Sequence, residues 1–134
     1  MHELVLRIKK PELCYVFAKN ATDRGRPELA LEAYRRAVEL RADDHKPQSE
    51  AERDALRAFY AYEEALSALK GKRTRATGTW QMVNRHGLFD TLVKRMHART
   101  KDEASPKLAE LGMEDLSFKA VYERHSDAFA AAAA

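Results

Sequence analysis

The sequence predicts an all-α protein, a compact bundle of six or seven helices. Only five glycines and four prolines occur in 134 residues, and alanine, leucine, glutamate, arginine and lysine dominate, which is the composition of packed helices. Apolar residues make up 45% of the chain and recur at helical spacings. A chain of this length buries roughly two-thirds of its unfolded surface. We therefore expect a single helical domain over residues 1–129.

The predicted domain begins with a helical hairpin over residues 1–41. Segment 4–8 is too short to be assigned as strand or helix. Pro11 is well placed to begin a helix that ends near Gly25, and a second helix, which begins with a proline, is expected over 27–40. The apolar stripes of these helices are Leu13, Cys14, Phe17 and Ala21, then Ala30, Leu31, Tyr34, Ala37 and Val38.

Residues 14–40 resemble a tetratricopeptide repeat. The family's usual offsets are occupied by Phe17, Ala18, Gly25, Ala30, Tyr34, Ala37 and Leu40. The stretch lacks the family's early large aromatic and the proline after the second helix, and no second copy follows at a period of roughly 34 residues. A peptide-binding groove needs several repeats, so the resemblance implies a helical hairpin rather than a functional repeat.

A long central helix is expected after a polar loop at 41–48. Ser49 and Glu52 have the spacing of a capping box, which begins a helix, and Gly71 ends it. The inward row is Ala55, Phe59, Tyr62, Leu66 and Leu69, beside a row of Ala51, Ala58, Ala65 and Ala68. Glu63 and Glu64 are neighbours that point roughly 100° apart on a helix, so we expect them to be separate surface charges.

Residues 49–101 combine this central helix with a basic helical region. A loop at 71–78 precedes a short helix at 79–86, and Gly87 is predicted to end that helix in a left-handed conformation. In the next helix, 88–99, the pattern predicts which side chains face inward. The inward residues are Leu88, Phe89, Leu92, Val93 and Met96, and the outward ones are Thr91, Lys94, Arg95, His97 and Arg99.

The C-terminal part, 102–129, is predicted to form acidic helices. Ser105 and Pro106 indicate a helix start, Gly112 a stop, and a last helix reaches about His125. The alanine run at 130–134 carries no information on function.

Charge is distributed unevenly along the chain, although the formal total is only +3. Residues 1–69 have a balance of −1, residues 70–101 of +8, and residues 102–134 of −4. Concentrated lysine and arginine attract phosphate backbones through long-range electrostatics and counterion release. The alternative is that these cations keep the surface soluble or pair with the acidic C-terminal part.

We therefore predict nucleic-acid binding through residues 70–101, with DNA favoured over RNA. Thr74, Thr77 and Thr79 have hydroxyls suited to phosphate, and Gln81, Asn84 and Arg85 are side-chain types that bond base edges. The predicted contact residues are Lys72, Arg73, Arg75, Thr77, Gln81, Asn84, Arg85, Thr91, Lys94, Arg95, Arg99 and Lys101.

Residues 79–98 resemble a helix-turn-helix with Gly87 as the turn glycine. Apolar core positions of the family are occupied by Met82, Leu88, Val93 and Met96, whereas Val83 and His86 depart from its pattern. The resemblance implies that Thr91, Lys94 and Arg95 face the major groove, and that Arg73, Arg75, Arg99 and Lys101 contact phosphates. Trp80 is expected in the core with Phe89 and Leu92, against the Phe59 and Tyr62 face.

The sequence contains no catalytic, cofactor or metal signature. The five histidines do not have zinc-site spacing, and residues 71–78 do not match a nucleotide-binding loop. We expect no metal and no cofactor. His86 and His97, together with Asp90, leave open a nuclease or a nuclease accessory subunit.

Cysteine usage and the N-terminal segment predict a cytoplasmic protein. The single cysteine, Cys14, has no partner for an internal disulfide. Residues 1–10 lack a secretory signal pattern, and no apolar run approaches the roughly 20 residues of a membrane span. The leading hypothesis is a small, non-enzymatic, bacterial-type nucleic-acid-binding protein. The alternative is a protein-interaction module that uses Tyr34, Tyr60 and the hairpin.

Overall fold

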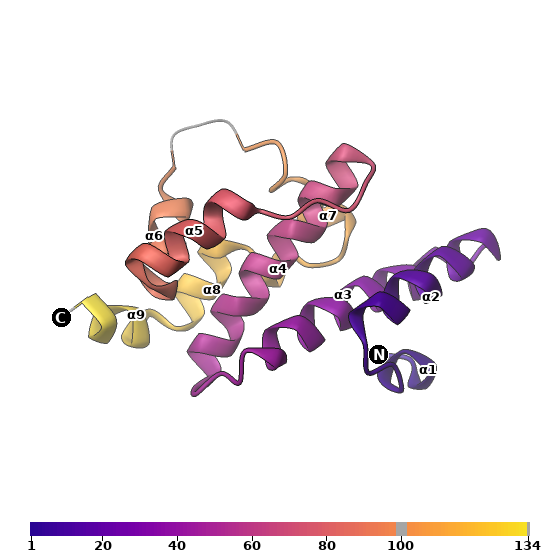
Figure 1. The fold of residues 1–134 in the computed structure, drawn as a ribbon, viewed down its shortest axis with the longest axis horizontal. Helices are drawn as coiled ribbons and strands as arrows, with labels where there is room; N and C mark the ends of the chain where they lie inside the picture. Colours follow the sequence, from indigo (N-terminus) through magenta and orange to yellow (C-terminus); the bar gives the residue numbers. More distant parts are fainter. Residues whose placement is uncertain (99–101, 134) are drawn as a thin grey trace. The chain divides into compact units, whose positions relative to one another are not determined.

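The computed structural model describes residues 1–98 and 102–133. The all-α prediction is confirmed, since every regular element within those residues is a helix. The chain divides into two compact units, Met1–Lys46 (unit 1) and Pro47–Ala134 (unit 2), each with its own contacts (Figure 1). Two predicted contact residues, Arg99 and Lys101, lie outside the described residues.

Unit 1 is a helical hairpin, as predicted. It consists of α1 (Glu3–Leu6), α2 (Pro11–Asp23) and α3 (Pro27–Asp44). Figure 1 shows α2 and α3 side by side. Their interface is filled by small residues, namely Cys14, Ala18, Ala21, Ala30, Ala33 and Ala37. Small side chains let the two helix backbones approach closely, which explains how such a short hairpin packs.

Two details of unit 1 differ from the sequence prediction. Residues Glu3–Leu6 form a helix, so the unassigned segment begins with a helical turn. The helix α3 continues to Asp44 rather than ending at Leu40, because Ala42 is buried and extends the packed face by one turn. The polar loop predicted at 41–48 therefore begins only at His45.

Unit 2 is built around α4 (Glu50–Lys70). The helix begins as predicted, with Ser49 Oγ accepting a hydrogen bond from Glu52 N at 3.1 Å, and ends at Gly71 in a left-handed conformation. The other elements are α5 (Thr77–His86), α6 (Leu88–Met96), α7 (Lys107–Glu110), the 3₁₀ helix η1 (Glu114–Leu116), α8 (Phe118–Arg124) and α9 (Ser126–Ala133). The described residues thus hold more helical segments than predicted, because several are single turns.

An aromatic cluster forms the core of unit 2. The buried residues include Phe59, Leu92, Phe118, Val121 and Phe129. Ring centroids lie 5.6 Å apart for Phe59 and Trp80, and 4.7 Å apart for Phe89 and Phe129. The prediction that Trp80, Phe89 and Leu92 pack against the Phe59 and Tyr62 face is confirmed. The predicted inward row of α4 is less buried at the C-terminal end of the helix, where Leu69 is exposed.

Gly87 joins α5 to α6 in a conformation that the sequence did not indicate. Its φ of 88° and ψ of 164° lie outside the left-handed helical region that we predicted. This combination is essentially restricted to glycine, and it makes one residue both the end of α5 and the start of α6. A helix-turn-helix uses a turn of three or four residues, so the α5–α6 junction is tighter than the resemblance implies.

None of the helices in the described ranges has the length and apolar character that crossing a membrane requires.

Candidate nucleic-acid interface

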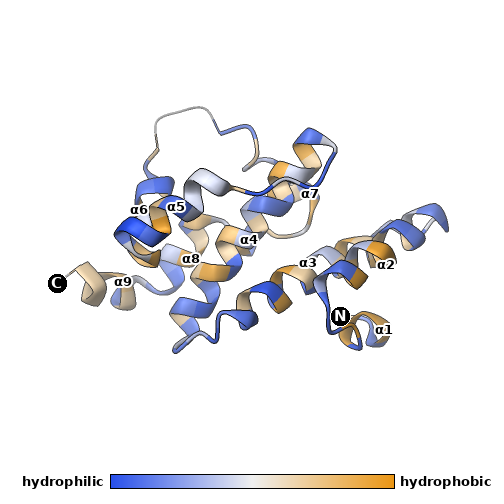
Figure 2. Ribbon diagram, in the orientation of Figure 1, coloured by the Kyte–Doolittle hydropathy of each residue, from blue (hydrophilic) through white to orange (hydrophobic). Residues whose placement is uncertain are grey.

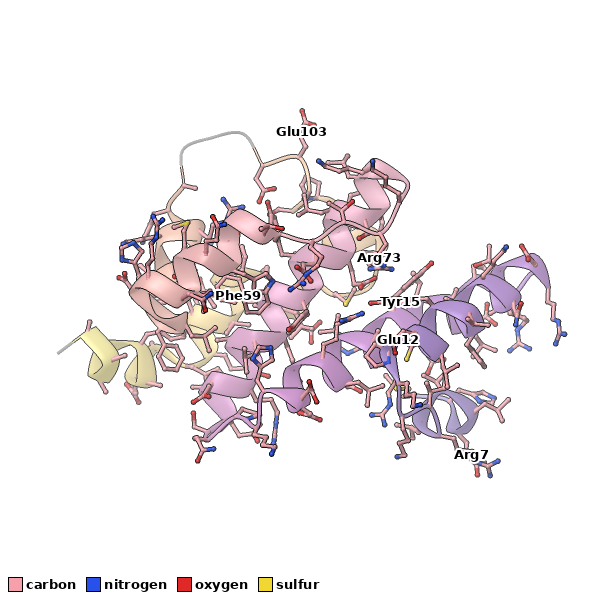
Figure 3. All side chains as sticks on the ribbon, viewed as in Figure 1. Arg7, Glu12, Tyr15, Phe59, Arg73 and Glu103 are labelled. Carbon is pink, nitrogen blue, oxygen red and sulfur yellow. The ribbon has the colours of Figure 1, made fainter. Side chains whose placement is uncertain are left out.

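The loop at residues 71–76, here called the basic loop, is fastened to the C-terminal half of α4. Ser67 Oγ accepts a hydrogen bond from Thr74 N at 2.9 Å and donates one to Glu63 O at 2.8 Å. Arg73 Nη1 donates to Glu64 Oε2 at 2.6 Å; Arg73 is labelled in Figure 3. These contacts hold both the backbone and one cation of the loop in place.

Glu63 fixes the end of the loop to the start of α5. Its Oε2 accepts hydrogen bonds from Ala76 N at 2.8 Å and from Trp80 Nε1 at 2.9 Å. The prediction that Glu63 and Glu64 are surface charges is wrong, since both side chains are buried. A carboxylate accepts several hydrogen bonds at once, so donors from the loop and α5 compensate for its burial. The two carboxylates serve different partners, as their helical spacing suggested.

The remaining cations of the basic loop are exposed. Neither Lys72 nor Arg75 has an ion pair among residues 1–98 and 102–133. Thr74 is not available to a ligand in the way we predicted, because its hydroxyl donates to Lys72 O at 2.8 Å. Figure 2 shows the loop as hydrophilic over most of its length. A braced loop therefore presents two free positive charges.

One face of α5 continues this surface. Thr77, Gln81, Asn84 and Arg85 are exposed. Gln81 comes four residues after Thr77, and Asn84 and Arg85 come three and four residues after Gln81, which makes them neighbours on the helix surface. We call these four residues the α5 outer face. Thr79, proposed as a phosphate donor, is buried on the opposite side. The structure thus brings the exposed residues of α5 into one row that follows directly from the basic loop.

The helix α6 does not present the residues that the helix-turn-helix resemblance assigned to the groove. Thr91 was predicted to face outward, and this is wrong, since its side chain is completely buried with no hydrogen-bond partner for Oγ1 in the described structure. Lys94 Nζ pairs with Asp90 Oδ2 at 3.1 Å. The guanidinium carbon of Arg95 lies 4.9 Å from the centroid of the Tyr62 ring. Of the three residues that we assigned to the groove, Thr91 and Arg95 therefore pack against unit 2 itself, and Lys94 is exposed but paired within α6.

Two acidic residues of the C-terminal part pair with lysines that lie three or four residues before them in the sequence. Lys107 pairs with Glu110 at 3.1 Å, and Lys119 approaches Glu123 at 3.9 Å. Both pairs lie within the C-terminal part and involve no cation of residues 70–98.

The bracing residues were missed by sequence reasoning. Ser67 lies on α4 four residues after Glu63 and three after Glu64. Its hydrogen bond with Thr74, in the loop, explains why a polar residue is buried there. The adjacent carboxylates of Glu63 and Glu64 were the available signal, because a glutamate pair on a packed face requires donors.

The residues named for the nuclease alternative are only partly brought together. His86 and Asp90 line a common hollow, but Asp90 is paired with Lys94. His97 is exposed and does not line that hollow. Within the described ranges, no three histidine, cysteine or acidic side chains are arranged to share a metal ion.

Comparison of the chain with protein-family models, with curated proteins and with solved structures finds no significant match.

Proposed function

We propose that this protein binds nucleic acid, with DNA favoured, through the basic loop and the α5 outer face. The observation that carries the proposal is the exposure of Lys72, Arg75 and Arg85, none of which has an ion pair within the described residues. Unpaired cations next to exposed amide and hydroxyl side chains suit a phosphate backbone with adjacent base edges. The buried brace from α4 supports the proposal, because a loop ordered in advance loses less entropy on binding.

The test is binding of a fluorescent DNA duplex, measured by anisotropy over a range of salt concentrations. Replacing Lys72, Arg75 and Arg85 together by Gln is expected to weaken binding at least tenfold. It should also reduce the slope of log affinity against log salt by about 3, one for each lost phosphate contact. A matched triple in unit 1, with Lys9, Lys10 and Lys19 replaced by Gln, removes the same charge from exposed positions.

Equal losses in the two triple variants would show that only net charge matters, and would overturn the assignment of the site. No binding by the wild type at about 50 mM salt would overturn the function itself. Parallel titrations with an RNA duplex and with single strands test the preference for DNA.

Exposed apolar side chains in unit 1 favour a second candidate function, the protein-interaction module. Leu13 and Val16 on α2 are 53% and 57% exposed, and Leu4 and Leu6 on α1 are similarly open. Large apolar side chains gathered at a surface mark interaction sites. Replacing Leu13 and Val16 by Ser is expected to abolish capture of a protein partner and to leave duplex binding unchanged. Retained capture would exclude this face.

A further inference from the structure

A cavity of about 570 Å³ lies in unit 2, between the C-terminal half of α4, the end of α6, residues 102–105 and the start of α8. This volume falls within the range of about 300–1,000 Å³ that is typical of small-molecule sites. The apolar part of its lining is Tyr62, Leu66, Leu69, Met96 and Phe118. A ligand with an apolar body would therefore find a matching surface.

Two cations belong to the described lining, Arg95 and Lys119. Lys119 Nζ approaches Glu123 Oε1 at 3.9 Å, whereas Arg95 is held by stacking rather than by an acid. The guanidinium carbon of Arg95 lies 4.9 Å from the Tyr62 ring centroid, within the range of a cation–π contact. Its Nε is buried and has no hydrogen-bond partner in the described part of the chain, where no carboxylate pairs with it either. Buried donors of native proteins nearly always have partners. Because Nε itself is closed off, an anion in the cavity would pair with the Nη groups of the same guanidinium.

Three other polar side chains of the lining, those of Asp102, Ser105 and Ser117, already form hydrogen bonds. Asp102 Oδ1 accepts hydrogen bonds from Ala104 N at 3.0 Å and Ser105 N at 3.2 Å, and its second oxygen accepts from Ser105 Oγ. Ser117 Oγ accepts from Ala120 N at 3.1 Å. Of the two cations in the described lining, Arg95 is thus the one without a carboxylate partner.

The acids at the rim limit the charge of the ligand. The side chain of Glu103 is exposed and extends away from the body of unit 2 (Figure 3). A dianionic phosphate would carry its second charge close to Asp102 and Glu103, where like charges repel. A single planar carboxylate matches the planar fork of one arginine.

We propose that this cavity binds a small amphipathic monocarboxylate. Arg95 binds the carboxylate, and the apolar body of the ligand packs against Leu66 and Phe118. The site goes beyond the proposed nucleic-acid function, because none of its residues belongs to the basic loop or the α5 outer face.

The experiment is isothermal titration calorimetry of the full chain with octanoate, octanol and octyltrimethylammonium, which share one alkyl chain and differ in head group. Octanoate is expected to bind at least tenfold more tightly than the other two. The variant Arg95→Met keeps an apolar side chain and removes the charge, and should lose at least tenfold in octanoate affinity. Arg85→Met, on the α5 outer face, is the matched control and should bind octanoate as the wild type does.

A second variant protects the test against misfolding. Leu66→Trp fills the cavity while leaving Arg95 in place, and should also abolish octanoate binding in a protein whose helical circular dichroism is unchanged. Equal affinity for the three probes, or unchanged octanoate binding in Arg95→Met, would overturn the proposal. Loss of duplex affinity in Arg95→Met with octanoate affinity retained would return Arg95 to the nucleic-acid interface and overturn it as well.

Discussion

His125 Nε2 lies 2.8 Å from Asp54 Oδ2, which joins the end of α8 to α4 across 71 residues of sequence. Arg124 Nε donates to the same oxygen at 3.2 Å, and Arg57 Nη1 lies 3.4 Å from Oδ1. Burial by itself raises the pKa of Asp54. The hydrogen bond from His125 and the charges of Arg124 and Arg57 outweigh burial, so the pKa of Asp54 lies below its ordinary value of 3.8. The carboxylate is therefore stabilising in its charged form.

Replacing Asp54 by Asn is expected to lower the free energy of unfolding by about 2 kcal/mol at neutral pH, because charge-assisted hydrogen bonds are lost. A carboxylate whose pKa is lower in the folded than in the unfolded state contributes stability above the unfolded pKa, and that contribution disappears as pH falls through the folded pKa. Urea denaturation should therefore show the two proteins converging as the pH falls below about 4. Glu123→Gln, at an exposed site, should change stability by less than about 0.5 kcal/mol. A gap between wild type and Asp54→Asn that is constant with pH would contradict the assignment.

Thr91→Val should raise the free energy of unfolding by about 1 kcal/mol. The valine side chain has nearly the same shape, and it removes a hydroxyl that is buried without a partner in the described structure. Chemical denaturation measures the change. The control is Thr77→Val on the exposed start of α5, which should shift stability by less than about 0.5 kcal/mol. Destabilisation of Thr91→Val would mean that the hydroxyl is hydrogen-bonded.

Two glycines in the same region should respond oppositely to alanine. Gly87→Ala places a side chain at φ 88° and ψ 164°, and should cost about 2 kcal/mol in unfolding free energy. Gly78 lies within α5, where an added Cβ meets no atom within 4 Å. Gly78→Ala should therefore stabilise by about 0.5–1 kcal/mol, because alanine favours helix. Thermal melting of both variants distinguishes the two effects, and a stable Gly87→Ala protein would refute the stated conformation.

Substitution of Arg73 and of Arg75 should affect stability and duplex binding differently, although only one residue separates the two arginines. Arg73→Met removes the partner of buried Glu64 and should destabilise the fold by about 2 kcal/mol. Arg75 is exposed and without an ion pair in the described structure, so Arg75→Met should leave stability within about 0.5 kcal/mol of wild type. If the proposed function holds, Arg75→Met weakens duplex binding more than Arg73→Met does. Melting curves measure the stability of both variants, and anisotropy measures their duplex affinity. Equal stability and equal affinity of the two variants would show that the contact between Arg73 and Glu64 does not set the two arginines apart.

Local patterns were enough to predict most of the helices. The capping of α4 by Ser49, the prolines that begin α2 and α3, and the stop at Gly71 are chemical signals carried by a few neighbouring residues. Boundaries set by packing were less predictable. The helix α3 continues to Asp44, and the burial of Ala42 in its last turn is a tertiary property that local sequence does not reveal.

The predicted contact residues also divide into those whose exposure follows from local sequence and those whose burial depends on packing. Lys72, Arg75, Thr77, Gln81, Asn84 and Arg85 are exposed, in keeping with their polarity. Thr91 and Arg95 are as polar, yet α6 directs them into the packed unit. Periodicity identifies the faces of a helix but does not say how much of each face its neighbours cover. A short helix in contact with several others is therefore easily misjudged.

The sequence by itself determined that this protein is all-α, where its central helix begins and ends, and that its positive charge is concentrated in residues 70–101. These properties follow from composition and from interactions within a few residues. The tertiary structure decided which of those charges are free, because Glu64 binds Arg73 and the Tyr62 ring packs against Arg95, whereas Lys72 and Arg75 stay exposed. Burial makes such pairing necessary, and burial depends on contacts between residues that are far apart in the chain.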